Sequence, residues 1–352
     1  MSWNCLRPLV FALAFILIAE VVLETRAHSR GFKTILFGDI VQQDPVKSER
    51  AATEDGSDVQ AVWGPTKDFA YRSQVLSADK SANAVRVWIA SASHAEDLRV
   101  SVGRIFPNLL ATLFAQRGQF VEVINASRAG MSIGANKAEL VSEFKTWKPD
   151  AVILYQLVND FTRITKGSKD NSEVGAAGIS ISIGFQNRIN ALLQETTLYP
   201  IVKTNVSARI REKCLLPIEL PLAADDDFMC EIEGFVDSTR LLGAEPILCT
   251  FAMSHDELNF CEMPVDYRLG MLRQNPSVAP LGWIRTKERW NQKIRKYCEQ
   301  NKVLLVDVDR SLGGRPEFFR DSVHFNEKGH AKFADQIASF LTEVEIAGTK
   351  EK

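Results

Sequence analysis

The pattern of apolar segments after residue 83 predicts an α/β fold with a mostly parallel five-stranded sheet. Five short aliphatic runs alternate with segments in which apolar residues recur at helical spacing. Such runs are typical of strands with both faces buried, as in a parallel sheet covered by helices on each side. A hydrophobic content of 45% over 352 residues is sufficient for the core of such a domain.

The expected strands are rich in valine, isoleucine, leucine and alanine. They are residues 85–90, 121–124, 151–158, 246–250 and 303–308. In a parallel sheet the carboxyl ends of the strands meet along one edge, where the functional residues of such folds gather. We therefore expect the functional site in the segments that follow these runs.

The expected helices lie between these strands and after the last of them. They are residues 106–116, 136–147, 228–242 and 283–301, with a final helix after Asn326. The apolar residues of that final helix fall on one face at i, i+3 and i+4 spacing: Phe333, Ala334, Ile337, Ala338 and Leu341.

Two connections are too long to be simple loops. Residues 161–227 contain a glycine-rich stretch, and residues 252–282 contain His255 and Cys261. Both leave from the carboxyl ends of expected strands. We therefore expect two insertions that cover the site and bind substrate.

The first 30 residues are expected to form a signal peptide or a signal-anchor helix. Arg7 precedes an apolar run over residues 9–23 that only Glu20 interrupts. The run is shorter than the roughly 20 apolar residues of a spanning helix and matches the core of a secretory signal. Both alternatives predict export, to the periplasm or another extracytoplasmic location, with membrane contact through residues 6–23. A polar lead-in over residues 31–83 then precedes the main domain, residues 84–345.

Charge and spacing exclude several classes of partner. A formal net charge of −2 without a dense Lys/Arg cluster gives no basis for nucleic-acid binding. The absence of Cys-x-x-Cys and His-x-x-x-His spacings argues against a structural metal, and we expect no cofactor. Five cysteines follow Cys5, an odd number that leaves at least one unpaired in an oxidising compartment, and the pairing stays open, with Cys214 and Cys230 one candidate pair. They are Cys214, Cys230, Cys249, Cys261 and Cys298.

The segment Asp321-Ser-Val-His324 can supply an acid–base pair. The two residues are three positions apart in the sequence, so in a tight turn the carboxylate reaches the imidazole. A carboxylate bonded to one ring nitrogen fixes the tautomer and leaves the other nitrogen as a general base. The alternative is an ordinary helix lead-in in which the aspartate is a cap and the histidine lies on the surface.

A base needs a nucleophile, and the first expected strand ends in small hydroxyl residues, Ser91-Ala92-Ser93-His94. We take Ser93 as the candidate nucleophile and Ser91 as its competitor. Gly130 follows the second strand, and glycine permits a backbone geometry in which an N–H points into a site. Asn159 comes at the end of the third strand, and its side-chain amide can donate to a developing oxyanion.

Taken in order, these blocks resemble the SGNH (GDSL-type) hydrolase family, in which blocks named for Ser, Gly, Asn and His follow successive strands. The match covers roughly residues 84–341 and includes both insertions. The resemblance implies a flavodoxin-like three-layer α/β/α sandwich. One block departs from the family pattern, because Ser91-Ala92-Ser93 stands where the family has Gly-Asp-Ser or Gly-Gly-Ser.

The resemblance also implies a role for each block. Ser93 corresponds to the nucleophile, His324 to the base and Asp321 to the residue that orients it. The oxyanion hole corresponds to the N–H groups of Ser93 and Gly130 together with the Asn159 side chain.

Two further expectations concern the neighbours of these blocks. His94 either contacts substrate or, as the sequence favours, lies on the surface. His330 belongs to the start of the terminal helix and is not catalytic.

The expected activity is a carboxylic-ester hydrolase, deacetylase or O-acetyltransferase that acts on exported glycan or lipid esters. The alternative is a catalytically inactive SGNH-like protein that binds glycans or assists assembly of the cell envelope.

Overall fold

The computed structural model describes residues 15–25 except 17, the pairs 51–52, 58–59 and 62–63, residues 70–167 except 74, 75 and 82, and residues 198–212 and 216–346. The chain divides into two compact units. One comprises Met1–Lys47 and Glu173–Cys214, and the other Ser48–Ser172 and Leu215–Lys352. The described residues of the first unit are helical and include α7, Leu198–Glu212. The second unit contains the sheet and all of the expected site residues.

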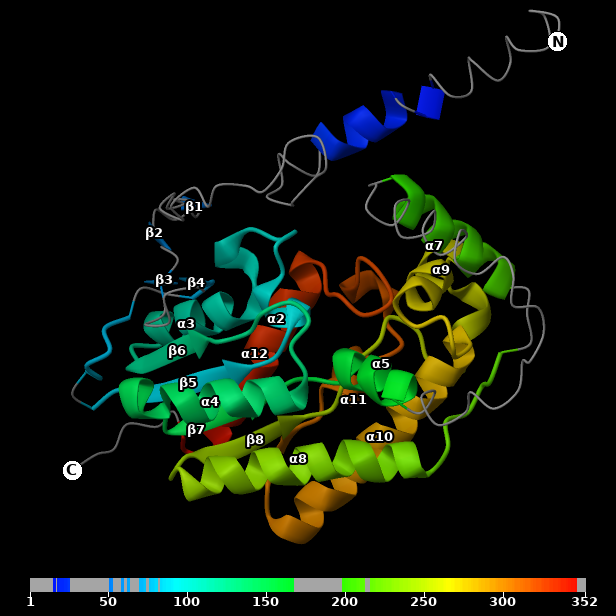
Figure 1. Ribbon diagram of the computed structural model, residues 1–352. Coiled ribbons are helices and arrows are strands. Elements are labelled where there is room, and N and C mark those ends of the chain that lie inside the picture. The colour runs from blue at the N-terminus through cyan, green and yellow to red at the C-terminus, as the bar shows by residue number, and fades with distance from the viewer. Residues whose placement is uncertain are drawn as a thin grey trace, which may run out of the picture. The chain divides into compact units, whose positions relative to one another are not determined.

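A five-stranded sheet forms the centre of the second unit (Figure 1). Its strands are β5 (Val85–Ala90), β6 (Val121–Asn125), β7 (Ala151–Leu154), β8 (Glu245–Cys249) and β9 (Leu304–Val306). The strand order is β6-β5-β7-β8-β9, and every neighbouring pair is parallel. This is the flavodoxin-like order 2-1-3-4-5 of doubly wound sheets, so the predicted fold class is confirmed.

Helices cover both faces of this sheet. On one face α3 (Phe106–Gln116) packs against α12 (Glu327–Glu343), and the other face carries α4 (Ile133–Trp147), α8 (Ala223–Leu241) and α10 (Pro280–Asn301) (Figure 1). All five apolar residues expected on one face of α12 are fully buried, which confirms that amphipathic pattern. Asn326 caps this helix by accepting the N–H of Gly329 at 3.1 Å.

The remaining described elements are short. Two antiparallel strand pairs lie in the expected lead-in, and the other elements are helices of at most ten residues. They are β1 (Ala51–Ala52), β2 (Asp58–Val59), β3 (Val62–Trp63), β4 (Ala70–Tyr71), α2 (Ser93–Glu96), η1 (Val102–Arg104), α5 (Val158–Gly167), η2 (Phe260–Glu262), α9 (Val265–Gln274), α11 (Val308–Leu312) and η3 (Pro316–Phe318).

Two strands end earlier than the sequence predicts. β7 stops at Leu154, and α5 begins at Val158, although apolar residues continue between them with only Gln156 as an interruption. β9 stops at Val306 because the side chain of Asp307 accepts the N–H of Arg310 and caps α11. Apolar character alone does not distinguish a buried strand from the buried start of a helix, so these ends could not be placed.

Both expected insertions contain helices at their borders. The segment 161–227 begins within α5 and ends within α8, while residues 168–197 lie outside the described part. The segment 252–282 contains η2 and α9 and runs into α10, which starts at Pro280. A proline at the first helical position is favourable because its missing N–H has no partner there in any case.

The structure bears on the expected membrane segment and on the expected cysteine pairing. Among the described residues no helix is long and apolar enough to cross a membrane. Cys230, Cys249, Cys261 and Cys298 are free thiols, and Cys214 lies outside the described residues.

Candidate active site

Ser93 lies just past the carboxyl end of β5, at the first position of α2. It is half-buried, and its Oγ lies 3.0 Å from Nε2 of His324. The competing hydroxyl of Ser91 is fully buried and donates to the carbonyl of Tyr155 at 2.5 Å. Ser93 is therefore the one of the two serines whose hydroxyl faces a base.

His324 is held from its other side by Asp321. Its Nδ1 lies 2.9 Å from Oδ2 and 3.0 Å from Oδ1 of the carboxylate. The backbone N–H groups of Val323 and His324 also donate to Oδ1, at 3.0 and 2.8 Å, and close a tight turn. Because the carboxylate can only accept, Nδ1 carries the proton and Nε2 is free to accept the Ser93 hydroxyl.

The environment of Asp321 keeps this carboxyl ionised. Burial opposes ionisation, but the hydrogen bond and charge of His324 and the two backbone N–H groups outweigh it. Together they hold the pKa of Asp321 well below its usual range. The turn thus provides a permanent negative charge beside the His324 ring.

The loops after β6 and β7 meet around Met131. The side-chain amides of Asn159 and Gln156 both donate to the Met131 carbonyl, at 2.7 and 2.5 Å. Gly130, the preceding residue, is exposed and has φ of +85°, a conformation that favours glycine. A carboxylate oxygen of Glu96, on α2, accepts the N–H of Ala129 at 2.7 Å and joins this loop to the helix of Ser93.

Asp160 also holds the segment that follows β6. It is fully buried, and the N–H of Ile133 donates to both of its carboxylate oxygens at 3.1 Å. Burial raises the pKa of Asp160 to about 6, although the N–H of Ile133 and the amide of Gln156 stabilise the ionised form.

A second His–Asp pair adjoins the first, and no sequence pattern indicated it. Nε2 of His330 donates to Oδ2 of Asp97 at 3.0 Å, while its Nδ1 accepts the N–H of Phe106 at 3.2 Å. Nη1 of Arg320 donates to the same Asp97 oxygen at 2.6 Å. Burial opposes ionisation of Asp97, but the hydrogen bonds from His330 and Arg320 lower its pKa to about 2. His330 is thus fully buried within this cluster and makes no contact with Ser93 that would give it the role of a base.

The expectation that His94 lies on the surface is wrong. Its side chain is only 1% exposed, because the short helix α2 turns it inward against the ends of β7 and β8. There its ring contacts those of Tyr155, Phe251 and His324.

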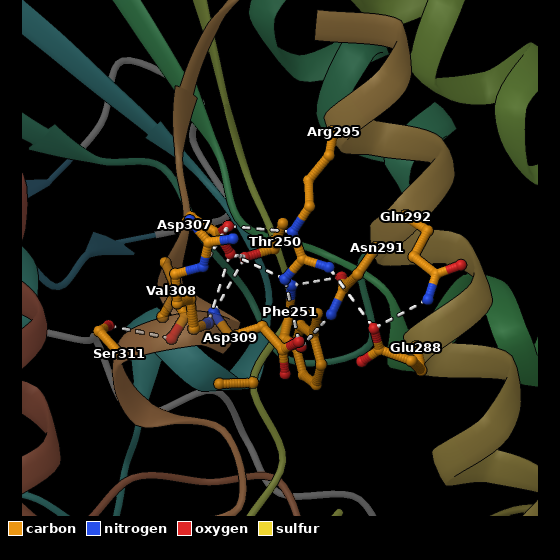
Figure 2. Close-up of polar contacts among 12 residues, drawn as sticks. Thr250, Phe251, Glu288, Asn291, Gln292, Arg295, Asp307, Val308, Asp309 and Ser311 are labelled. Carbon is orange, nitrogen blue, oxygen red and sulfur yellow. Dashed lines mark hydrogen bonds and ion pairs between the residues drawn. The ribbon is translucent and has the colours of Figure 1, made fainter.

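An ion-pair network holds the carboxyl ends of β8 and β9 together (Figure 2). The guanidinium of Arg295 donates to Asp307 at 2.9 Å and to Asp309 at 3.2 Å, and the hydroxyl of Thr250 donates to Asp307 at 2.8 Å. The buried ammonium of Lys287 donates to Asp309 at 2.7 Å. These paired charges and the hydroxyl of Thr250 hold the two strand ends together.

Comparisons with known proteins give structural likeness at low identity. No protein-family model and no curated protein matches the chain. An acetylxylan esterase from Geobacillus stearothermophilus, solved as a catalytic mutant, is similar at 13% identity and a TM-score of 0.44, over 75% of this chain and 96% of that chain. The psychrotrophic esterase EstA from Pseudoalteromonas sp. is similar at 12% identity and a TM-score of 0.44, over 74% of this chain and 98% of that one.

A member of the lipolytic G-D-S-L family from Veillonella parvula is similar at 11% identity and a TM-score of 0.41, over 74% of this chain and 98% of that one. Likeness at this level assigns no activity, so the function of the chain rests on the side chains described above.

Proposed function

We propose that this protein is a serine ester hydrolase or O-acyltransferase in which Ser93, His324 and Asp321 form the catalytic triad. The observation that carries the proposal is a pair of contacts on the two ring nitrogens of His324. Nε2 lies 3.0 Å from the Ser93 hydroxyl, and Nδ1 lies 2.9 Å from the Asp321 carboxylate. A hydroxyl, an imidazole and a half-buried carboxylate in this order are the arrangement that activates a serine.

In the proposed reaction Ser93 Oγ attacks the carbonyl carbon of an ester and passes its proton to His324 Nε2. The tetrahedral intermediate then expels the alcohol, which takes that proton from His324 and leaves an acyl-serine. Water repeats the sequence and releases the acid, whereas a sugar hydroxyl in its place would accept the acyl group. Asp321 stays ionised throughout and stabilises the imidazolium that forms twice in the cycle.

We assign the oxyanion hole to the N–H groups of Ser93 and Gly130 and to the side chain of Asn159. The amide of Asn159 has two hydrogens, and the one donated to Met131 fixes the direction of the other. The positive φ of Gly130 allows a backbone orientation that other residues adopt at a cost. Donors fixed before the reaction stabilise the oxyanion without reorganisation.

The proposed substrates are acyl, in particular acetyl, esters of exported glycans or lipids. This part of the proposal rests on the apolar run over residues 9–23, which predicts export by a signal peptide or a signal anchor. N-terminal sequencing of the protein recovered from the cell envelope and from the medium tests it. A mature chain that starts after residue 23 indicates cleavage, and an intact chain found in the cytoplasm contradicts export.

Labelling with a fluorophosphonate probe, which reacts with activated serines, tests the triad. We expect the wild-type protein to be labelled at Ser93 and to cleave p-nitrophenyl acetate. Ser93→Ala should lose both properties. The matched control is Ser91→Ala, which removes a neighbouring hydroxyl that is bonded to the Tyr155 carbonyl, and it should retain both.

Ester cleavage that survives in Ser93→Ala would rule out the proposed mechanism. A wild-type protein that is neither labelled nor active would favour the alternative of a non-catalytic glycan-binding protein. For an active protein, free acetate as the product indicates a hydrolase. Transfer of acetyl to an added oligosaccharide indicates a transferase.

A further inference from the structure

The ring of His94 packs against that of His324, the proposed catalytic base. It follows Ser93 in the chain, and its ring stacks on that of His324 with centroids 5.0 Å apart and an interplanar angle of 20°. The side chain of His94 is only 1% exposed, whereas that of His324 is 23% exposed. His94 therefore forms the inner wall against which the His324 ring rests.

Aromatic rings from two other strand ends hold His94 in place. Phe251 meets it edge-on at 4.9 Å and 82°, and Tyr155 does so at 5.9 Å and 83°. These two rings stack on each other at 4.9 Å. Figure 2 shows how Phe251 is fixed, since its N–H donates to the side chain of Asn291 at 2.8 Å and its carbonyl accepts from the same amide at 2.9 Å.

The histidine at this position is energetically unfavourable for the fold. Neither of its ring nitrogens has a hydrogen-bond partner among the described residues. Buried polar atoms without a partner destabilise a protein, and an apolar ring of similar shape would not carry this cost. Burial, assisted by the nearby His324, also lowers the pKa of His94 well below its usual value, so the ring is neutral. Such a group in a native core calls for an explanation outside stability.

We infer that His94 is a positioning residue for His324, and this inference rests on the proposed function. The hydrogen bond to Asp321 holds Nδ1 of His324 but leaves the tilt of its ring about that contact free. The flat face of His94 removes this freedom and keeps Nε2 directed at the Ser93 hydroxyl. A neutral aromatic face also accommodates the imidazolium that forms in the reaction, because a cation is attracted to such a face.

Two substitutions distinguish the effect of a flat stacked ring at position 94 from the effect of side-chain volume alone. His94→Phe keeps a flat ring and removes the unpaired nitrogens, whereas His94→Leu keeps an apolar side chain and removes the flat face. We expect His94→Leu to lower kcat by roughly 10- to 100-fold with KM unchanged, the cost of a misplaced catalytic group. His94→Phe should keep kcat within about threefold of wild type and should unfold at a higher urea concentration.

Phe235→Leu serves as the control, because it replaces another fully buried ring by leucine, in α8 and outside the stack on His324. It should lower stability and leave kcat unchanged. A wild-type kcat in His94→Leu would overturn the inference. So would a kcat in His94→Phe as low as that of His94→Leu, because it would show that the ring nitrogens and not the stacked face are needed.

NMR of the histidine rings tests the inference without any turnover. The chain has only five histidines, so ¹⁵N labelling of the imidazoles gives a readable spectrum. In wild type and His94→Phe we expect His324 to show one tautomer, protonated at Nδ1. In His94→Leu, Asp321 should still fix this tautomer, but the His324 signals should broaden because the ring samples several tilts. Unchanged His324 signals in His94→Leu would overturn the inference even if the protein hydrolyses no ester.

Discussion

Substitution of one residue, Asn159, tests the proposed oxyanion hole. One of its two hydrogens is bonded to the Met131 carbonyl at 2.7 Å, and the other can meet a developing negative charge. We expect Asn159→Ala to lower kcat by roughly 100- to 1,000-fold and to change KM by less than about threefold, because this donor acts in the transition state. Steady-state kinetics with p-nitrophenyl acetate measure both constants.

Another asparagine, which is buried, provides the control for this substitution. The amide of Asn136 in α4 donates to the carbonyl of Ser132 at 2.9 Å and serves the helix rather than the site. Asn136→Ala should keep kcat near the wild-type value. Equal losses in the two variants would mean that Asn159 acts only through its structural contact with the Met131 carbonyl.

The residues that sequence reasoning found and those that it missed differ in one physical respect. Ser93 and Asn159 follow strand ends, and Asp321 and His324 are neighbours in the chain, so order and spacing indicated them. Asp97 and Arg320 form an ion pair across 223 residues of sequence. No local periodicity encodes such a contact, and only the three-dimensional structure brings the two side chains together.

At the scale of elements, the pair of Asp97 and Arg320 joins α2, which carries Ser93, to the turn that carries His324. Asp97 ends α2 with φ of +29°, a conformation that is costly for a residue other than glycine. A buried ion pair with Arg320 and a hydrogen bond from His330 maintain it. We expect Asp97→Asn to lower the free energy of unfolding by roughly 2 to 4 kcal/mol at pH 7, measured by urea denaturation.

The pH dependence of this loss has a definite sign. The pKa of Asp97 is about 2 in the folded state and lies near its ordinary value of about 4 in the unfolded chain. Its stabilisation is therefore complete above about pH 4 and is lost as the pH falls through about 2. The control is Asp335→Asn, which removes a surface carboxylate of α12 that is 53% exposed, and it should change stability by less than about 0.5 kcal/mol. A destabilisation by Asp97→Asn that is the same at pH 7 and pH 2.5 would contradict this assignment.

The elements themselves were predictable where their apolar pattern had a clear end. The expected ranges 85–90 and 106–116 coincide with β5 and α3, because polar residues or a proline mark their ends. The range 151–158 does not coincide with β7, because apolar residues continue past Leu154 into α5 with only Gln156 between them. Tertiary packing, and not the sequence pattern, decides where that strand ends.

At the scale of the whole molecule, two buried groups give the fold opposite dependences on pH. Asp160 has a raised pKa of about 6 in the folded state. As the pH rises, the unfolded chain therefore loses the Asp160 proton at a lower pH than the folded protein does, and the free energy of unfolding falls between about pH 4 and pH 6. His94 has a lowered pKa in the folded state. As the pH falls, the unfolded chain therefore binds a proton at His94 at a higher pH than the folded protein does, and the free energy of unfolding falls below about pH 6.5. The two effects oppose each other in the wild-type protein, and only variants separate them.

We therefore expect Asp160→Asn and His94→Phe to change the pH profile of stability in opposite directions. Relative to wild type, the free energy of unfolding of Asp160→Asn should rise by roughly 3 kcal/mol between about pH 4 and pH 6 and then level off. That of His94→Phe should instead gain on wild type as the pH falls from about 6.5. Urea denaturation at intervals from pH 4 to pH 8 measures both differences. Because each is taken against the wild type at the same pH, groups that titrate alike in both proteins cancel. A difference curve for Asp160→Asn that is flat over this range would mean that Asp160 is ionised with an ordinary pKa. The loop that it holds against Ile133 would then carry no electrostatic cost.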